Sequence, residues 1–133
     1  EASPVPGWIC RMLLAHIATG DWVLQTHLRS LIDTGAPAPW PDIDAGNAAR
    51  LAERTYTTHD ALTEEDLSMR HETLRLLAQL RPEHLSQPID LWWKPEPRRA
   101  TVQMYLDGFH EHDDHHGEQL RGGMKWARAL RGK

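Results

Sequence analysis

Histidines are the residues of this chain whose type and spacing could support chemistry. There are nine in 133 residues, and four of them fall between positions 110 and 116. His112 and His116 are four residues apart, so a helix would place both imidazoles on one face, one turn apart, where they can bind one metal ion. They also continue an apolar stripe that runs from Phe109 to Leu120. A solvated polar face often produces this spacing as well, but burying an unpaired histidine is costly, so the position on the stripe strengthens the interpretation as metal ligands.

A metal site needs at least a third ligand, and His16 is the candidate. It follows Met12 and Leu13 on the apolar stripe of another predicted helix, so it would point into a helical bundle, where such proteins build their metal sites. Taken alone, His16 would more often be a hydrogen-bonded core histidine. His27 lies near the same stripe and is a rival ligand. The other histidines are expected off the stripes or on the surface: His59, His71, His84, His110 and His115.

The spacing of apolar residues predicts the elements that must position these side chains. Five segments are expected: helices at residues 8–33, 45–59 and 63–81, a loop at 83–100 and a last helix at 101–130. The first helix ends where Gly35 and three prolines stop it. Thr63, which is followed by three acidic residues, is the predicted N-cap of the third helix.

No segment shows convincing strand alternation, so the sequence predicts an all-α protein with a single domain over residues 1–133. The expected architecture is an up-down helical bundle of the four-helix type. Three long helices and one short one do not close such a bundle. We therefore expect either that its first helix is missing from this chain or that a partner chain covers the open face.

Composition and charge exclude several classes of protein. The hydrophobic content is 40% and the formal net charge is −4, without a basic block, so nonspecific nucleic-acid binding, which depends on cationic side chains, is not expected. No apolar run approaches the roughly 20 residues of a membrane span, and no signal peptide is visible. The single cysteine, Cys10, cannot form an internal disulfide, which predicts a reducing compartment and hence the cytoplasm.

Two motifs occur in a suggestive order: Leu14-Ala15-His16-Ile17-Ala18 after Trp8, and later His112-Asp113-Asp114-His115-His116-Gly117-Glu118-Gln119-Leu120. Together they resemble the DinB/YfiT-like superfamily of metal-dependent enzymes, over nearly the whole chain. The resemblance implies a four-helix bundle, often dimeric, with a divalent metal held by three histidines. Carried onto this sequence, the ligands are His16, His112 and His116. Members of the superfamily include transferases and isomerases that use mycothiol or bacillithiol, and a related domain in sulfoxide synthases holds iron.

The start of the chain departs from the pattern of that superfamily. Its members have a long helix before the tryptophan, whereas Trp8 is almost at the start here. They also favour Ser or Thr just after the tryptophan and Glu three residues later, which form a capping box. Here those positions are Ile9 and Met12, which indicates a changed packing environment or an altered sequence. Cys10, between them, is expected to be a packed thiol rather than a nucleophile.

Three neutral imidazoles would leave a bound ion its full charge and an open coordination position. With zinc, that position would hold a water whose pKa falls toward about 7, or a substrate thiol as thiolate. The leading hypothesis is a metal-dependent enzyme acting on a small molecule, as a hydrolase or a thiol transferase, with a low-molecular-weight thiol as one candidate co-substrate and a homodimer as the expected assembly. Zinc is expected first, although nickel, iron and copper also bind imidazole.

Two other functions remain open at this point. One is a non-catalytic helical binding or dimerisation module, and the other is iron-dependent oxygen chemistry on a sulfur substrate. If there is a metal, Asp113, Asp21 and Glu72 are candidates to orient the ligand imidazoles, although each also fits a solvated helix charge. Three loop tryptophans are expected either to rim the pocket or to pin the loops to the bundle: Trp40, Trp92 and Trp93.

Overall fold

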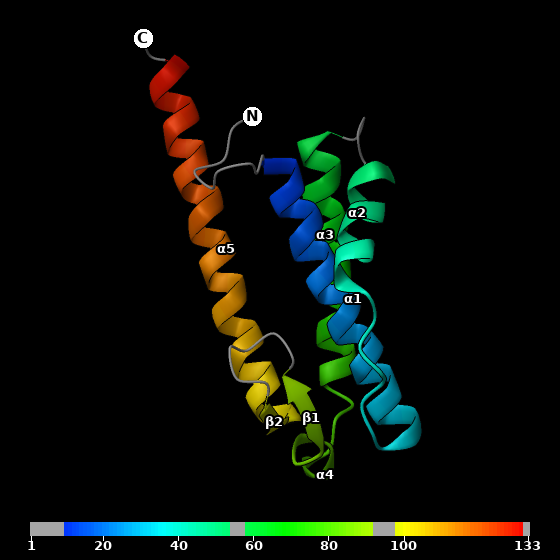
Figure 1. Cartoon of the computed structure of the whole chain (residues 1–133). Helices are drawn as coiled ribbons and strands as arrows, with labels where there is room; N and C mark the ends of the chain where they lie inside the picture. Colours follow the sequence, from blue (N-terminus) through cyan, green and yellow to red (C-terminus); the bar gives the residue numbers. More distant parts are fainter. Residues whose placement is uncertain (1–9, 54–57, 92–97, 132–133) are drawn as a thin grey trace.

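The computed structural model of the chain describes residues 10–53, 58–91 and 98–131 (Figure 1). In chain order the elements are α1 (Cys10–Thr34), α2 (Ile43–Glu53), α3 (His59–Leu77), α4 (Pro82–Leu85), β1 (Pro88–Leu91), β2 (Arg98–Thr101) and α5 (Val102–Arg131). Within the described ranges the protein is mostly helical, as the sequence predicts, with one small two-stranded sheet.

The central helix is α1, which contacts α2, α3 and α5. Its apolar positions recur every three or four residues, so one face of the helix is buried. That face includes four leucines: Leu13, Leu24, Leu28 and Leu31. The helix is stopped by Gly35, whose φ of 80° lets its N–H bond the Leu31 carbonyl at 2.9 Å. The predicted end is confirmed, while the predicted start at Trp8 and the position of Ile9 lie outside the described residues.

The contact between α2 and α1 is close at Gly46. A Cβ at that position would lie 2.8 Å from a ring carbon of Trp22, nearer than a side chain tolerates. Glycine therefore lets α2 approach α1 closely enough for Asn47 to reach His16. The helix begins two residues before the predicted segment and ends at Glu53 within the described part of the chain.

The third helix begins earlier than predicted. Thr58, rather than Thr63, is the N-cap of α3, and its hydroxyl accepts a hydrogen bond from the Ala61 N–H at 3.2 Å. The reason is Leu62, which is only 2% exposed and so has to lie on the buried face of the helix. The acidic residues after Thr63 are therefore inside α3, which ends before Pro82 as predicted.

The segment predicted to be a loop, residues 83–100, contains secondary structure. It includes most of α4 and an antiparallel pairing of β1 with β2, in which Ile89 is opposite Ala100. Ile89, Leu91 and Ala100 are buried, so alternate residues of the hairpin face the core. Strands of four residues beside prolines contain too few alternations to be recognised in the sequence.

His84 is a further correction in this region. It is predicted on the surface, but it is only 4% exposed. Its Nδ1 accepts a hydrogen bond from the Arg81 N–H at 3.0 Å and so caps the short helix α4. His71 is exposed, as predicted, and the side chain of His59 lies outside the described residues.

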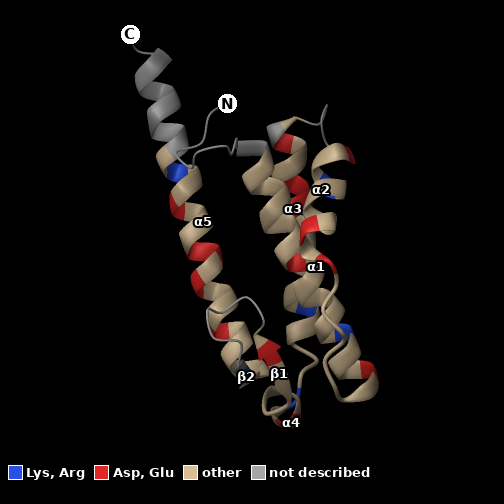
Figure 2. Ribbon diagram, viewed as in Figure 1, with Lys and Arg blue, Asp and Glu red and all other residues tan. Residues whose placement is uncertain are grey.

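The last helix, α5, runs beside α1 and is the longest element (Figure 1). Its first turn joins the core through Val102 and Tyr105, which pack with the hairpin and with leucines of α1 and α3. The charged residues on the exposed side of its described part are mostly acidic (Figure 2): Asp107, Glu111, Asp114 and Glu118. None of the described helices combines the length and the apolar character that crossing a membrane requires.

Candidate metal centre

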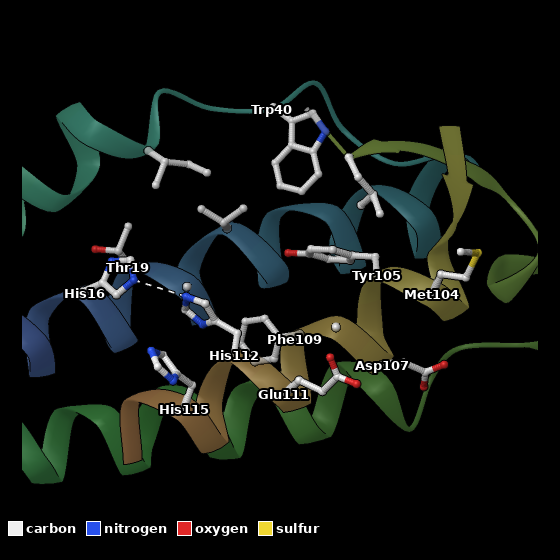
Figure 3. Close-up of a pocket in the computed structure, with 15 residues that line it drawn as sticks. His16, Thr19, Trp40, Met104, Tyr105, Asp107, Phe109, Glu111, His112 and His115 are labelled. Carbon is white, nitrogen blue, oxygen red and sulfur yellow. Dashed lines mark hydrogen bonds between the residues drawn. The ribbon is translucent and has the colours of Figure 1, made fainter. Parts of the chain in front are cut away.

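The three predicted ligands lie together in the structure. His16 comes from α1, and His112 and His116 come from consecutive turns of α5. One ring nitrogen from each lies within 4.8 Å of the other two, and Figure 3 shows His16 and His112 turned toward each other. The convergence of these side chains from two helices agrees with the stripe pattern in the sequence.

The three histidine rings come closest to one another at their Nε2 atoms. His112 Nε2 lies 3.3 Å from His16 Nε2 and 3.1 Å from His116 Nε2. Nitrogens that bind zinc at about 2.0–2.1 Å with tetrahedral angles lie about 3.3–3.4 Å apart. These two separations are close to that edge length, and the ligand atoms of all three residues lie within 4.8 Å of one another, so the arrangement is compatible with one bound ion.

Two amide side chains determine how the outer ring nitrogens are used. His16 Nδ1 lies 3.3 Å from the Asn47 amide oxygen, and His116 Nδ1 lies 2.7 Å from the Gln119 amide oxygen. An oxygen acceptor requires the proton on Nδ1, which leaves the lone pair of the same ring on Nε2. The amide group of Gln119 also donates to His115 Nε2 at 3.2 Å. Acceptors on the outer nitrogens are the arrangement that orients metal-binding imidazoles.

Partial burial favours the neutral form of two of the imidazoles, those of His16 and His112. Burial lowers the pKa of His16. The neighbouring His116 lowers it further, whereas the hydrogen bond with Asn47 raises it. For His112, burial and then the neighbouring His116, His16 and His115 lower the pKa to about 4. Neutral imidazole is the form that binds a metal, so these rings need lose no proton before binding one at neutral pH.

The carboxylates predicted to orient the imidazoles bind arginines instead. Arg70 of α3 donates to both oxygens of Asp21 at 3.1 Å each, and it also binds Asp113. Glu72 accepts hydrogen bonds from Arg75, one turn further along the same helix, at 2.7 and 2.8 Å. The long side chain of arginine reaches acids on neighbouring helices, which the sequence pattern does not reveal.

Arg70 joins three helices beside the histidines. Asp21 belongs to α1 and is 1% exposed, and its carboxylate also accepts a hydrogen bond from Thr73 of α3 at 2.8 Å. Asp113 belongs to α5 and is the neighbour of His112 in the chain. The guanidinium therefore holds α5 against α1 and α3 at the level of the candidate ligands.

The rival ligand, His27, lies in the aromatic core instead. It is 1% exposed, and its ring centroid is 4.3 Å from that of Trp40 and 5.7 Å from that of Tyr105. Neither ring nitrogen makes a well-formed hydrogen bond within the described residues, although the Ala38 backbone is near. Burial lowers the pKa of His27 to about 4. This histidine is a core residue and does not join the cluster.

A pocket of about 760 Å³ adjoins the cluster (Figure 3). His16 and His112 line one end, and Trp40 and Met104 lie toward the other. Trp40 fulfils both expectations for it, because it lines the pocket and also fixes its loop by donating its indole N–H to the Asp90 carbonyl at 2.8 Å. Trp92 and Trp93 lie outside the described residues.

No protein-family model, curated protein or solved structure matches this chain. The resemblance to the DinB/YfiT-like superfamily, and the four-helix bundle that it implies, therefore remain predictions. The structure itself supplies the geometry of three imidazoles, their amide partners and an adjoining pocket.

Sequence reasoning missed two residues that support the cluster. Gln119 lies three residues after His116, within reach along one helix face, so helical spacing was a usable signal for it. Asn47 reaches His16 across 31 positions of the chain, and no spacing predicts such a contact. Its nearest signal is Gly46, because a glycine inside a helix often marks a close approach of backbones.

Proposed function

We propose that this chain is a metal-dependent enzyme that acts on a small molecule bound beside its three histidines. The observation that carries the proposal is the convergence of three Nε2 atoms, two of which have their lone pairs directed inward by amide acceptors. Three imidazoles without an ion satisfy one another only in part, because each Nε2···Nε2 contact can share at most one proton. A cation between them would bind all three lone pairs.

A divalent ion at this point would supply Lewis acidity at an open coordination position and lower the pKa of a water or thiol bound there. The residues of the chain favour the neutral form of His16 and His112, orient His16 and His116 through Asn47 and Gln119, and provide a substrate pocket beside them. Hydrolysis and thiol transfer both use such an activated nucleophile. Zinc is the metal proposed first, with nickel, iron and copper as alternatives that also bind imidazole.

Titration of the metal-free, untagged protein with Co²⁺ tests the metal centre. We expect one Co²⁺ per chain, visible absorption bands of four-coordinate cobalt, and a change in those bands when 2-mercaptoethanol occupies the open position. His110→Ala is the matched control, because this exposed histidine of α5 lies beside Asp114 and outside the cluster. Absence of binding, or unchanged binding after His16→Ala, would contradict the proposal.

Turnover then separates an enzyme from a binding module. Metal-loaded protein is assayed for hydrolysis of aryl esters and for conjugation of low-molecular-weight thiols to electrophiles. We expect one of these activities to disappear when the metal is removed and to return when it is added back. If the protein binds Co²⁺ through the three histidines but neither hydrolyses the esters nor conjugates the thiols, the result would favour a non-catalytic binding module.

A further inference from the structure

The pocket has a continuous aromatic wall that leads to the histidines. Tyr105, Phe109 and His112 follow one another on the inner face of α5 at spacings of four and three residues. Their ring centroids are 6.5 Å apart at each step, and Trp40 extends the row, 5.4 Å from Tyr105. A single helix face therefore changes from aromatic side chains to candidate metal ligands along the length of the pocket (Figure 3).

The opposite wall offers few polar partners. It includes Val23 and Gly20 of α1, and the Phe109 ring lies 3.5 Å from where a Cβ of Gly20 would stand. Ile43 and Leu91 add aliphatic surface from α2 and β1. Thr19 also lines the pocket, but its hydroxyl donates to the Ala15 carbonyl at 2.9 Å, one turn back in its own helix. Away from the histidines, this surface suits an apolar ligand body.

The charged residues among the described lining side chains are both acidic. Asp107 and Glu111 are exposed, lie four residues apart on α5, and are seen on the same side of the pocket in Figure 3. No Lys or Arg belongs to the described lining. A ligand with an anionic body would therefore meet like charge at this edge and find no cationic side chain there.

We propose that the pocket binds a ligand with a metal-binding donor group at one end and an uncharged aryl or arylalkyl body at the other. The body lies along the row from Phe109 to Trp40, and the donor group reaches the histidine cluster. His112 and Tyr105 are seven residues apart, which is about 10 Å along a helix, so the ligand is about that long. This inference rests on the proposed metal centre and adds the chemical class of its substrate.

Hydroxamates with different tails test the ligand class on zinc-loaded protein by calorimetry. Acetohydroxamate supplies the donor alone, 4-phenylbutanohydroxamate adds the aryl body, and succinic monohydroxamate adds an anionic tail. We expect the phenyl compound to bind at least about tenfold more tightly than acetohydroxamate, because each buried methylene is worth roughly a factor of three to four. We expect succinic monohydroxamate to bind no more tightly than acetohydroxamate. Equal affinity for all three, or preference for the anionic tail, would overturn the proposal.

Two matched variants locate the aryl body. Met104 is 43% exposed and lines the end of the pocket farthest from the histidines, whereas Leu74 is 56% exposed on α3 and does not line it. Both positions are partly solvated, so glutamate should be tolerated in either helix. Met104→Glu should reduce the preference for the phenyl compound over acetohydroxamate to less than about threefold, since a charge there opposes burial of the tail. Leu74→Glu should leave the preference unchanged, and the reverse pattern would contradict the placement.

The outcomes distinguish this inference from the function on which it rests. If the protein binds no zinc through its histidines, the metal centre and the ligand class both fail. If zinc and acetohydroxamate bind but the phenyl tail adds no affinity, only the ligand class fails.

Discussion

Two polar clusters lie five residues apart on α1, and they are built in opposite ways. Around Asp21, a buried carboxylate meets a guanidinium and a hydroxyl, so that every donor faces an acceptor. In the histidine cluster, His112 Nε2 lies against the Nε2 atoms of both His16 and His116, so the same type of atom meets itself. Both clusters also take adjacent residues from α5, Asp113 in the first and His112 in the second.

The difference shows which cluster is complete by itself. A buried charge is stable when it is paired and hydrogen-bonded, as Asp21 is. Each Nε2···Nε2 contact can share at most one proton, so the imidazoles satisfy each other only in part, whereas a cation would use every lone pair. We therefore expect the Asp21 cluster to control folding stability and the histidine cluster to control metal binding.

The largest effect on stability is expected from Arg70→Met. Removing this guanidinium leaves the carboxylate of Asp21 buried, with Thr73 as its remaining side-chain donor among the described residues. This should lower the free energy of unfolding by about 3 kcal/mol. Urea unfolding of the metal-free protein measures the change. Arg75→Met is the control on the same helix, because Arg75 pairs with Glu72 at the surface and should matter much less. Equal losses from the two variants would contradict the assigned role of Arg70.

His27 is also buried and polar, but unlike Asp21 it makes no well-formed hydrogen bond within the described residues. Burial lowers its pKa from 6.5 to about 4, so the unfolded chain takes up a proton that the folded chain refuses between these values. The stability due to neutral His27 is thus present above pH 6.5 and is lost as the pH falls toward 4. Between pH 7 and 4.5, the wild type should lose about 2 kcal/mol more than His27→Leu in urea unfolding. Equal losses of unfolding free energy in the two proteins would show that His27 does not cause the pH dependence.

The smallest effect concerns the amide acceptors of the histidine cluster. Asn47→Leu should weaken zinc binding about tenfold, because the Nδ1–H of His16 loses the oxygen that orients its ring. Asn47→Asp keeps an acceptor and adds a negative charge, so it should bind zinc at least as tightly as the wild type. Competition with a chromogenic chelator measures both affinities. If the two variants are weakened alike, the contact is not what orients His16.

Helical periodicity was sufficient to predict the long helices and the meeting of the candidate ligands. His112 and His116 continue the apolar stripe of Phe109, and His16 continues that of Leu13. The helix face on which each histidine lies can therefore be predicted from spacing within a single helix. The same reasoning left His27 as a rival ligand and placed His84 on the surface, whereas both are buried away from the cluster. Both of these depend on which elements pack against each histidine, and that information is not local in the sequence.

Contacts between distant segments account for what the sequence did not reveal. The bridge from Arg70 to Asp21 and Asp113 depends on the relative positions of three helices. The start of α3 was misplaced because the three acidic residues after Thr63 resemble a first helical turn, whereas the helix begins after Thr58 and buries Leu62. The hairpin of β1 and β2 is too short to show alternation, and its burial against α5 stabilises it.

Elemental analysis of untagged protein most directly tests the claim that His16, His112 and His116 form a metal centre. The wild type, purified without chelator, is predicted to contain about one divalent ion per chain, as expected for one site. The double variant His112→Ala, His116→Ala is predicted to contain almost none while keeping the helical content of the wild type. An ion retained at full stoichiometry by the double variant, or absent from the wild type even after zinc is supplied, would contradict the account.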